Sequence, residues 1–403
     1  MMGTRLDGRP RVSAARTNRS AAGLRPAALA ALAALAAGSA VLGSCVSDGA
    51  GTARAAPAEA GTEAAAPASP SVSPGPTDQP VAPQAPLPAT ARLQLREASD
   101  LRPGYGPVTA QAWRRDGETL LTADFDRVQL WDAPGARNLG AMTESGGLIV
   151  DFSLFEPASG KARLAVASRD GTVAVWDPDD GARLASVPLD ADSLAWSPDG
   201  SALAVCLSDG RTLALAWPGL KVTAELAAGP GEAPLRAAWL RSGKELVLGG
   251  ASGALVLWKP GEPAARTLGS ASAAGTGPAG VSPAVRALAV SPDGIRAAAA
   301  RADGSVVVLD IASGTVLVRF PAHRGAALSV AWSPDGFRLA TGGEDKQVRV
   351  WEAADGAPQA MQHHNSLPVR SVAWRPGGRY LSSGAGSMDL RAHTGATILW
   401  EVP

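Results

Sequence analysis

The chain has 403 residues with 37 basic and 37 acidic side chains, so its formal net charge is zero. A balanced charge gives no electrostatic footprint for nucleic acid, and we expect no nucleic-acid partner. The chain contains two cysteines, Cys45 and Cys206, which excludes a framework of several disulfides. Its length would accommodate two or three ordinary domains, although repeat folds of this size form a single unit.

The N-terminal residues have the pattern of a secretory signal peptide. Residues 1–26 carry six arginines and one acidic residue, and residues 27–43 are mostly alanine and leucine. A basic start followed by a short apolar run and small residues is typical of such a signal. The run ends in Leu42-Gly43-Ser44-Cys45, which resembles the lipobox of bacterial lipoproteins. In that family the cysteine is acylated and becomes the first mature residue, so the resemblance implies a signal peptide over residues 1–45 and a lipid anchor on Cys45.

Two other interpretations of this segment stay open, namely an uncleaved anchor helix and an alanine-rich cytoplasmic tail. Residues 27–43 are fewer than the roughly twenty apolar residues that a membrane-spanning helix needs, which favours the lipoprotein signal. Inner-membrane lipoproteins often have an aspartate after the acylated cysteine, and Val46 stands there instead. By this resemblance we expect the protein in the bacterial cell envelope, with the outer membrane favoured.

Residues 46–90 consist of alanine, proline, glycine, serine and threonine with almost no large apolar side chain. Such a segment cannot bury enough apolar surface to fold. Proline-rich chains are semi-extended, at most about 3.1 Å per residue. We therefore predict a disordered tether over residues 46–90.

Residues 91–403 repeat a unit of roughly forty to fifty residues. The unit is clearest at 329–356, where residues 329–332, 337–342 and 347–351 alternate as three short strands joined by turns. Its first turn, Ser333-Pro-Asp-Gly336, recurs at 197–200 and 291–294, and incomplete matches to it occur at 114–117 and 375–378. The copies begin near residues 107, 147, 191, 233, 283, 327 and 367. This period predicts an all-β, seven-bladed β-propeller with four-stranded antiparallel blades.

The repeat resembles that of the WD-repeat family. In that family each repeat has a histidine before the first strand, a serine or threonine on the second, an aspartate in the next turn and a tryptophan on the third, and these side chains form a hydrogen-bonded structural network. The sixth copy matches all four positions, with His323, Thr341, Asp345 and Trp351.

The other copies match this pattern incompletely. Asp170 with Trp176, and Asp209 near Trp217, are partial matches, and Leu309 replaces the tryptophan of the fifth copy. The family assignment therefore depends on the repeat and its turns taken together.

The last copy lacks a fourth strand, because the chain ends at Trp400-Glu-Val-Pro directly after a third strand. The resemblance implies that an N-terminal strand completes this blade, which also removes an exposed pairing edge. Residues 91–97 alternate as a strand. We predict that they close the ring and that Leu93 and Leu95 fill this role.

Few residues are candidates for chemistry. The sequence has no glycine-rich phosphate loop, no Gly-x-Ser-x-Gly elbow and no His-Glu-x-x-His motif, so we expect neither enzymatic activity nor a cofactor. Cys206 lies in the apolar run 203–207 and is expected to be inert core packing.

Histidines of the seventh copy are a weak candidate metal site. His363 and His364 precede its first strand, and His393 lies in an insertion with Asp389. The resemblance implies that these two loops share a face, and such side chains can bind a metal. The alternative is solvated loop histidines, and we expect no metal.

Three arginines are the candidate partner-binding residues. Arg236, Arg286 and Arg370 stand early in first strands, and the corresponding places in the other copies are about Thr109, Leu148, Asp192 and Leu328. In the family these places lie near the mouth of the central channel, on the face that usually binds partners. Together the arginines would form a positive sector suited to carboxylates; the alternative is three independent solvated arginines.

These patterns favour a monomeric, non-enzymatic scaffold that binds protein partners and is anchored in the bacterial cell envelope. The alternatives are an envelope sensor for a ligand or metal, and a hydrolase or lyase that uses the channel mouth. The fold does not decide among them, because propellers host many functions.

Overall fold

The computed structural model describes residues 95–101, 106–143, 147–227, 234–268, 283–364, 367–387 and 395–403. The predicted signal peptide and tether, together with Leu93, lie outside the described residues. Within the described ranges the regular secondary structure consists of 28 strands. No helix of this part of the chain is long and apolar enough to cross a membrane.

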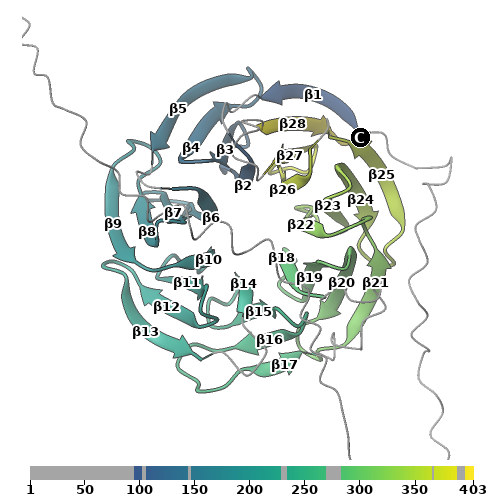
Figure 1. Ribbon diagram of the computed structural model, residues 1–403. Coiled ribbons are helices and arrows are strands. Elements are labelled where there is room, and N and C mark those ends of the chain that lie inside the picture. Colours follow the sequence, from purple (N-terminus) through teal and green to yellow (C-terminus); the bar gives the residue numbers. More distant parts are fainter. Residues whose placement is uncertain are drawn as a thin grey trace, which may run out of the picture. The chain divides into compact units, whose positions relative to one another are not determined.

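The strands form seven four-stranded antiparallel sheets, which are the blades of a propeller (Figure 1). In each blade an inner strand lines the central axis and three further strands follow outward. The inner strands of blades 1 to 7 are β2 (Val108–Trp113), β6 (Ile149–Phe155), β10 (Ala191–Trp196), β14 (Pro234–Trp239), β18 (Val285–Val290), β22 (Ala327–Trp332) and β26 (Val369–Trp374). Seven blades with copies beginning at these places confirm the predicted fold.

The second and third strands of each blade pair outward from the inner strand. The second strands are β3 (Thr119–Asp124), β7 (Arg163–Ser168), β11 (Ala202–Leu207), β15 (Leu246–Gly250), β19 (Arg296–Arg301), β23 (Arg338–Gly343) and β27 (Tyr380–Gly386). The third strands are β4 (Arg127–Asp132), β8 (Thr172–Trp176), β12 (Thr212–Ala216), β16 (Leu255–Trp258), β20 (Ser305–Asp310), β24 (Gln347–Glu352) and β28 (Gly395–Glu401).

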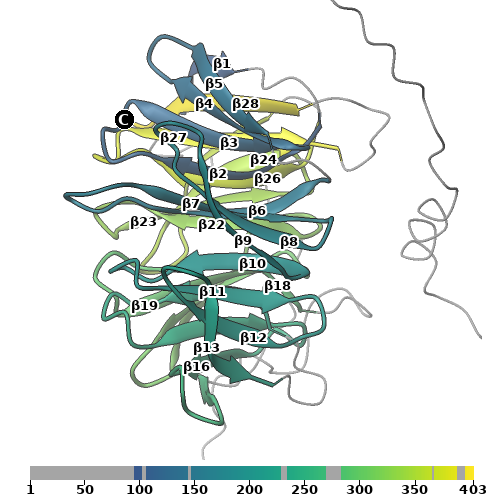
Figure 2. The ribbon, with the colours of Figure 1, turned by 90° about the vertical axis from the view of Figure 1, so that its left-hand side faces the viewer.

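The outer strands form the rim of the ring, which Figure 2 shows from the side. They are β5 (Arg137–Thr143), β9 (Arg183–Pro188), β13 (Lys221–Leu226), β17 (Arg266–Leu268), β21 (Val316–Pro321), β25 (Pro358–His363) and, for blade 7, β1 (Arg96–Leu101). We call the face at which the inner strands begin the upper face and the opposite one the lower face.

The Ser-Pro-Asp-Gly turns join inner to second strands at the lower face. In blade 6 the N–H of Gly336 donates to the carbonyl oxygen of Ser333 at 2.9 Å, and Gly336 has a φ of +74°. A glycine adopts this left-handed conformation without steric cost. The carboxylate of Asp335 accepts the N–H of Phe337 at 3.0 Å and so fixes the exit from the turn. The turn chemistry read from the sequence therefore positions the inner and second strands.

The hydrophobic core is divided among the seams between blades. Buried apolar residues of the described chain form seven clusters, and each lies between two neighbouring blades. The blades also approach closely, since a Cβ atom on Gly342 of β23 would lie 2.5 Å from Val369 of blade 7. Close packing across each seam makes the ring rigid.

Tryptophans at the ends of inner strands hydrogen-bond to the preceding blade. Each donates its indole N–H to the carbonyl oxygen of an alanine on the previous inner strand. The pairs are Trp113 with Ala373 at 3.2 Å, Trp239 with Ala195 at 2.9 Å, Trp332 with Ala289 at 3.1 Å and Trp374 with Ala331 at 3.3 Å. Blade 3 differs, because the indole N–H of Trp196 is buried without a hydrogen-bond partner.

The ring is closed by β1, which pairs antiparallel with β28 and completes blade 7. Of the predicted range 91–97, residues 91–94 lie outside the described residues, and Arg96 and Glu97 do pair with β28, but the strand spans Arg96–Leu101 and so ends four residues later than predicted. Leu95 precedes the strand and is buried in the seam between blades 6 and 7, and Leu101 is buried in the seam between blades 7 and 1. The closing segment thus contacts both neighbouring blades.

Candidate functional site

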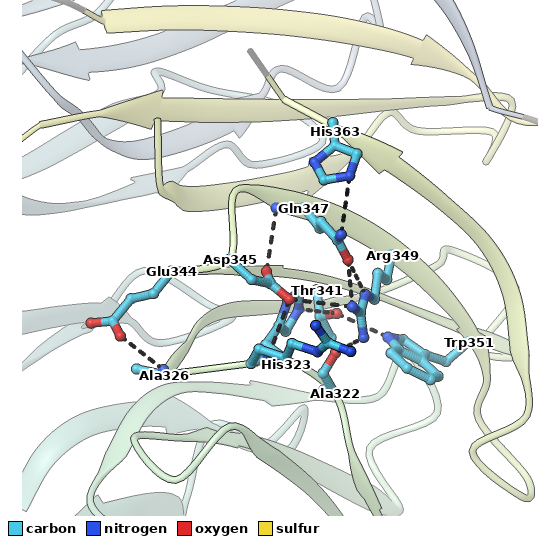
Figure 3. Close-up of polar contacts among 11 residues, drawn as sticks. Ala322, His323, Ala326, Thr341, Glu344, Asp345, Gln347, Arg349, Trp351 and His363 are labelled. Atoms are coloured by element: carbon cyan, nitrogen blue, oxygen red, sulfur yellow. Dashed lines mark hydrogen bonds and ion pairs between the residues drawn. The ribbon is translucent and has the colours of Figure 1, made fainter. Parts of the chain in front are cut away.

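The four signature residues of blade 6 form one hydrogen-bonded network, drawn in Figure 3. The Nδ1 atom of His323 lies 2.8 Å from Oδ1 of Asp345, and its Nε2 atom lies 2.8 Å from the hydroxyl of Thr341. The indole N–H of Trp351 donates to the same hydroxyl at 2.9 Å. We call these four residues the signature network.

The signature network is buried, which determines its role. Thr341 is fully buried, and His323 is 7% exposed. Burial lowers the pKa of His323 below its ordinary 6.5, although Asp345 opposes this shift. A carboxylate bonded to a histidine that is in turn bonded to a hydroxyl is also the arrangement of a nucleophilic catalytic triad. No substrate can reach the Thr341 hydroxyl, however, and that hydroxyl is already bonded to two partners, so the network ties β23 and β24 to the segment before β22.

Arg349 connects the network to Ala322 and Gln347 (Figure 3). Its Nη2 atom lies 3.2 Å from Oδ2 of Asp345, and its guanidinium also donates to the carbonyl oxygen of Ala322 and to the side-chain oxygen of Gln347. Burial opposes ionisation of Asp345, but hydrogen bonds, chiefly from His323, outweigh it and hold its pKa below the ordinary value. The charged groups of this region are therefore paired with one another.

Two further blades contain incomplete networks that the sequence did not reveal. In blade 1 the indole N–H of Trp131 donates to the hydroxyl of Thr122 at 3.0 Å. In blade 7 the indole N–H of Trp400 donates to the hydroxyl of Ser383 at 2.7 Å, and Nε2 of His364 bonds to the Ser383 carbonyl oxygen at 3.0 Å. The only sequence signal was a hydroxyl-bearing residue before a tryptophan. The separation is nine positions in blade 1 and seventeen in blade 7, where the insertion of copy seven lengthens it.

The partial matches named from the sequence have a simpler role. The carboxylate of Asp170 accepts the N–H of Thr172 at 3.0 Å, and that of Asp209 accepts the N–H of Arg211 at 3.0 Å. Both aspartates thus stabilise the turn between the second and third strands of their own blade. Trp217 instead packs edge-on against Trp196, with ring centroids 5.8 Å apart.

The histidines proposed as a weak metal site do not converge where they are described. His363 is exposed and its Nε2 atom lies 3.2 Å from the side-chain nitrogen of Gln347, whereas His364 is fully buried against Ser383 and Trp400. His393 and Asp389 lie outside the described residues. Across the described ranges, no group of three or more histidine, cysteine, aspartate or glutamate side chains is arranged to hold a metal ion.

A β-bulge occurs at the same place in all seven inner strands, near the upper face. At this bulge one inner-strand residue has no partner on the second strand. In blade 5, for example, Val285 pairs with Arg301 and Ala287 with Ala300, which leaves Arg286 as the extra residue. The seven extra residues are Thr109, Val150, Asp192, Leu235, Arg286, Leu328 and Arg370.

This register corrects the alignment of the arginines that was read from the sequence. Arg286 and Arg370 are equivalent, but Arg236 follows the bulge by one residue, because Leu235 is the extra residue of blade 4. In blade 2 the equivalent residue is Val150 and not Leu148. All seven strands have the bulge at the same place, so the offset arises from the sequence alignment. Arg286 and Arg370 stand four residues before the last residues of their strands, Val290 and Trp374, whereas Arg236 stands three before Trp239.

The three arginines all line one cavity on the propeller axis, with a volume of about 280 Å³. Residues from the seven inner strands form its wall, and the charged members of the wall are Asp151, Arg236, Arg286 and Arg370. The sequence prediction that these arginines lie at the central channel therefore agrees with the structure. Their surroundings, however, differ from one another.

Arg236 is engaged by the protein itself. Its guanidinium donates to the backbone carbonyl oxygens of Arg286 at 2.7 Å, Leu235 at 2.7 Å and Asp192 at 3.2 Å. It joins the inner strands of blades 3, 4 and 5. Arg370 donates from Nε to the carbonyl oxygen of Gly386 at 2.9 Å, and Arg286 is exposed.

The acidic groups beside the cavity are occupied by other partners. The carboxylate of Asp151 accepts the N–H groups of Phe152 at 2.9 Å and Leu194 at 3.0 Å. Its enclosure in the channel wall raises its pKa, and the charge of Arg236 only partly opposes this. Asp192 forms an ion pair with Arg169 at 3.1 Å. Neither carboxylate neutralises Arg286 or Arg370.

Cys206 lies in β11, is fully buried, and receives the hydroxyl of Thr212 at 3.7 Å. Burial raises the pKa of its thiol to about 12. A thiol with so high a pKa is unreactive at neutral pH, because the thiolate is the nucleophile. Its predicted packing role fits these surroundings.

Comparison with protein families supports the assignment that the fold and the signature network suggest. The family model described as WD domain, G-beta repeat matches residues 314–352 and 358–393. The first match spans β21 to β24, so the sequence repeat begins with the outer strand of one blade and ends with the third strand of the next. The chain belongs to the WD-repeat β-propeller family. Among curated proteins, none matches the sequence.

Proposed function

We propose that this protein is a non-enzymatic interaction scaffold of the bacterial cell envelope, held to a membrane through acylated Cys45. The observation that carries the scaffold function is the internal use of the signature residues. Their polar atoms bond to one another inside the ring, as His323 and Trp351 do on Thr341, so they rigidify the frame and leave binding to its faces. A preformed frame loses little conformational entropy when it binds a partner.

The seams support the same proposal. Indole hydrogen bonds and apolar clusters join each blade to its neighbours, and β1 joins the first and last blades. A protein partner that contacts several blades then meets one rigid surface. WD-repeat propellers commonly bind protein partners, and this chain shares their architecture.

The anchoring part of the proposal depends on the sequence of residues 1–90. The lipobox-like Leu42-Gly43-Ser44-Cys45 supplies the acylation site, and the proline-rich segment 46–90 supplies a tether between membrane and propeller. Two or more acyl chains give stable membrane attachment, since each buried methylene contributes about 0.8 kcal/mol. The outer membrane is the proposed location, and the propeller acts as a monomer.

In-cell crosslinking of the full-length protein tests this function. The protein is recovered from the membrane fraction, and its crosslinked partners are identified by mass spectrometry, with Cys45→Ala as the comparison. We expect one reproducible envelope protein, captured less when the anchor is removed, and incorporation of a labelled fatty acid that Cys45→Ala abolishes. Absence of any enriched partner from a membrane fraction that contains the protein would overturn the scaffold function.

A further inference from the structure

We propose that the upper mouth of the central channel binds an acidic peptide segment of the partner, whose carboxylates pair with Arg286 and Arg370. This inference rests on the proposed scaffold function, because it names the chemistry of the partner that the scaffold takes. It assigns the binding role to two of the three channel arginines and a structural role to Arg236.

The first step is the position of the two side chains. Arg286 and Arg370 are the extra residues of the bulges in blades 5 and 7, and Leu328 occupies the same place in blade 6 between them. All three line the same cavity. The bulge alone does not bring a side chain to the cavity, since Asp192 and Leu235 do not line it, so the placement of the two arginines depends on the cavity lining itself.

The second step is the supply of unused hydrogen-bond donors. Within the described residues the guanidinium of Arg286 forms no hydrogen bond or ion pair, and that of Arg370 uses only Nε, on the carbonyl oxygen of Gly386. Arg236, in contrast, is bonded to three carbonyl oxygens. Guanidinium groups with free Nη atoms bind carboxylates in pairs of parallel hydrogen bonds.

The third step is the charge of the cavity. Its wall has three arginines and one acidic residue, Asp151, which accepts two backbone N–H groups. The charge of Glu344 favours ionised Arg370, but the Glu344 carboxylate accepts the N–H of Ala326 at 3.0 Å and makes no ion pair with that arginine. The cavity therefore has excess positive charge at Arg286 and Arg370, which an anion neutralises.

The fourth step is the size and polarity of the site. Arg370 is only partly exposed, and this burial lowers the pKa of its guanidinium. An anion gains more from such a group than from one in bulk water. A water occupies about 30 Å³ in the liquid, so a cavity of about 280 Å³ admits a few side-chain groups of an extended segment but no folded element.

The test uses the purified full-length protein and two fluorescein-labelled peptides, hexaglutamate and its uncharged isostere hexaglutamine, with anisotropy as the readout. We expect hexaglutamate to bind, hexaglutamine not to bind, and salt to weaken the complex. Arg286→Gln with Arg370→Gln should weaken hexaglutamate binding by about tenfold or more, because charge-assisted hydrogen bonds are lost. The matched control, Arg115→Gln with Lys221→Gln, removes two exposed charges remote from the cavity and should change binding less than about twofold.

A single variant distinguishes loss of binding from loss of folding. Arg286→Gln alone removes no hydrogen bond of the described protein, so its thermal unfolding should match the wild type while its hexaglutamate affinity falls. Equal hexaglutamate affinity in wild type and the double variant would overturn the proposal, as would no hexaglutamate binding at all. Binding of citrate without binding of hexaglutamate would also overturn it, in favour of a free small anion.

The failure of this inference can be distinguished from failure of the scaffold function. If the crosslinking experiment captures the same partner with equal yield from wild type and from Arg286→Gln/Arg370→Gln, the carboxylate site is wrong and the scaffold stands. If wild type captures no partner but binds hexaglutamate through these arginines, the site stands and the scaffold function fails.

Discussion

The Nε2 atom of His323 lies 2.8 Å from the hydroxyl oxygen of Thr341, and the direction of this hydrogen bond is fixed on the other side of the ring. The ionised Asp345 carboxylate can only accept, so the proton of the neutral ring lies on Nδ1 and is donated to Asp345. Nε2 then accepts the hydroxyl hydrogen of Thr341, and the hydroxyl oxygen accepts the indole N–H of Trp351. The signature network thus satisfies each buried polar atom with a neutral histidine.

Thr341→Val should lower the free energy of unfolding by about 3 kcal/mol, because it leaves two buried partners, the His323 ring nitrogen and the Trp351 N–H, without hydrogen bonds. Thr122→Val in blade 1 is the matched control, since Thr122 is equally buried but serves one indole, that of Trp131. Thr122→Val should lower the free energy of unfolding by about 1.5 kcal/mol. Urea denaturation measures both, and equal losses in the two variants would contradict this explanation.

The contribution of two buried histidines to stability should be lost as the pH drops below about 6.5, whereas Asp124, whose pKa is raised by burial to about 7, and Asp151 contribute with the opposite sign. Burial lowers the pKa of both His323 and His364 from the ordinary 6.5. Between the folded and unfolded pKa values the unfolded chain therefore binds more protons, and each histidine can contribute a slope of up to about 1.4 kcal/mol per pH unit. The lowered pKa of Asp345 acts only at more acidic pH, because its stabilisation is complete above the unfolded value of 3.8.

Urea midpoints at pH 7.5, 6.5 and 5.5 check this expectation. His364→Gln should reduce the slope, since its buried ring can no longer take up a proton on unfolding. His363→Gln, which changes the exposed neighbouring ring, is the control. A slope in His364→Gln as steep as in the wild type would exclude this residue as a source of the pH dependence.

Two tryptophans that are similarly buried should respond differently to replacement by phenylalanine. Trp374 is 8% exposed and donates to the Ala331 carbonyl oxygen, whereas Trp196 is 7% exposed and its N–H has no partner. Trp374→Phe loses a hydrogen bond, while Trp196→Phe removes an unsatisfied donor. We expect Trp374→Phe to be more destabilising by about 1–2 kcal/mol. Calorimetry that ranks the two in the opposite order would contradict the assigned role of the seam hydrogen bonds.

The repeat architecture was predictable because its signals are local. Turns such as Ser333-Pro-Asp-Gly336 specify strand ends, and alternation specifies which side chains enter the core, so the number and order of blades followed from the sequence. The alignment of the arginines was missed although the sequence contains it, because Arg286 and Arg370 stand four residues before the ends of their inner strands and Arg236 stands three before Trp239. The bulge itself could not be predicted, since it depends on backbone geometry and not on side-chain type.

The limits of the closing strand were mispredicted for a related reason. Residues 91–97 alternate more regularly than β1, whose sequence Arg-Glu-Ala-Ser-Asp-Leu is polar along most of its length. A rim strand contacts the core on one side only and needs few apolar residues, so its position depends on pairing with β28. Arg96 and Glu97 of the predicted segment do pair with β28, but the strand continues through the polar residues that follow them, to Leu101.

Two N-terminal deletions test the role of β1. Removal of residues 1–101 should lower stability by several kcal/mol, because the ladder with β28 and the buried Leu95 and Leu101 are lost. Removal of residues 1–90 keeps β1 and should leave the thermal midpoint of the propeller unchanged. If both deletions melt at the same temperature, β1 does not hold the ring closed.

The most direct test of the account compares the crosslinked capture of the envelope partner by four forms of the full-length protein in one experiment. These are the wild type, Cys45→Ala, Arg286→Gln/Arg370→Gln and the control Arg115→Gln/Lys221→Gln. The account predicts one partner captured equally by the wild type and the control, and less by each of the other two. A wild type that captures no partner above background, although present in the membrane fraction, would contradict it.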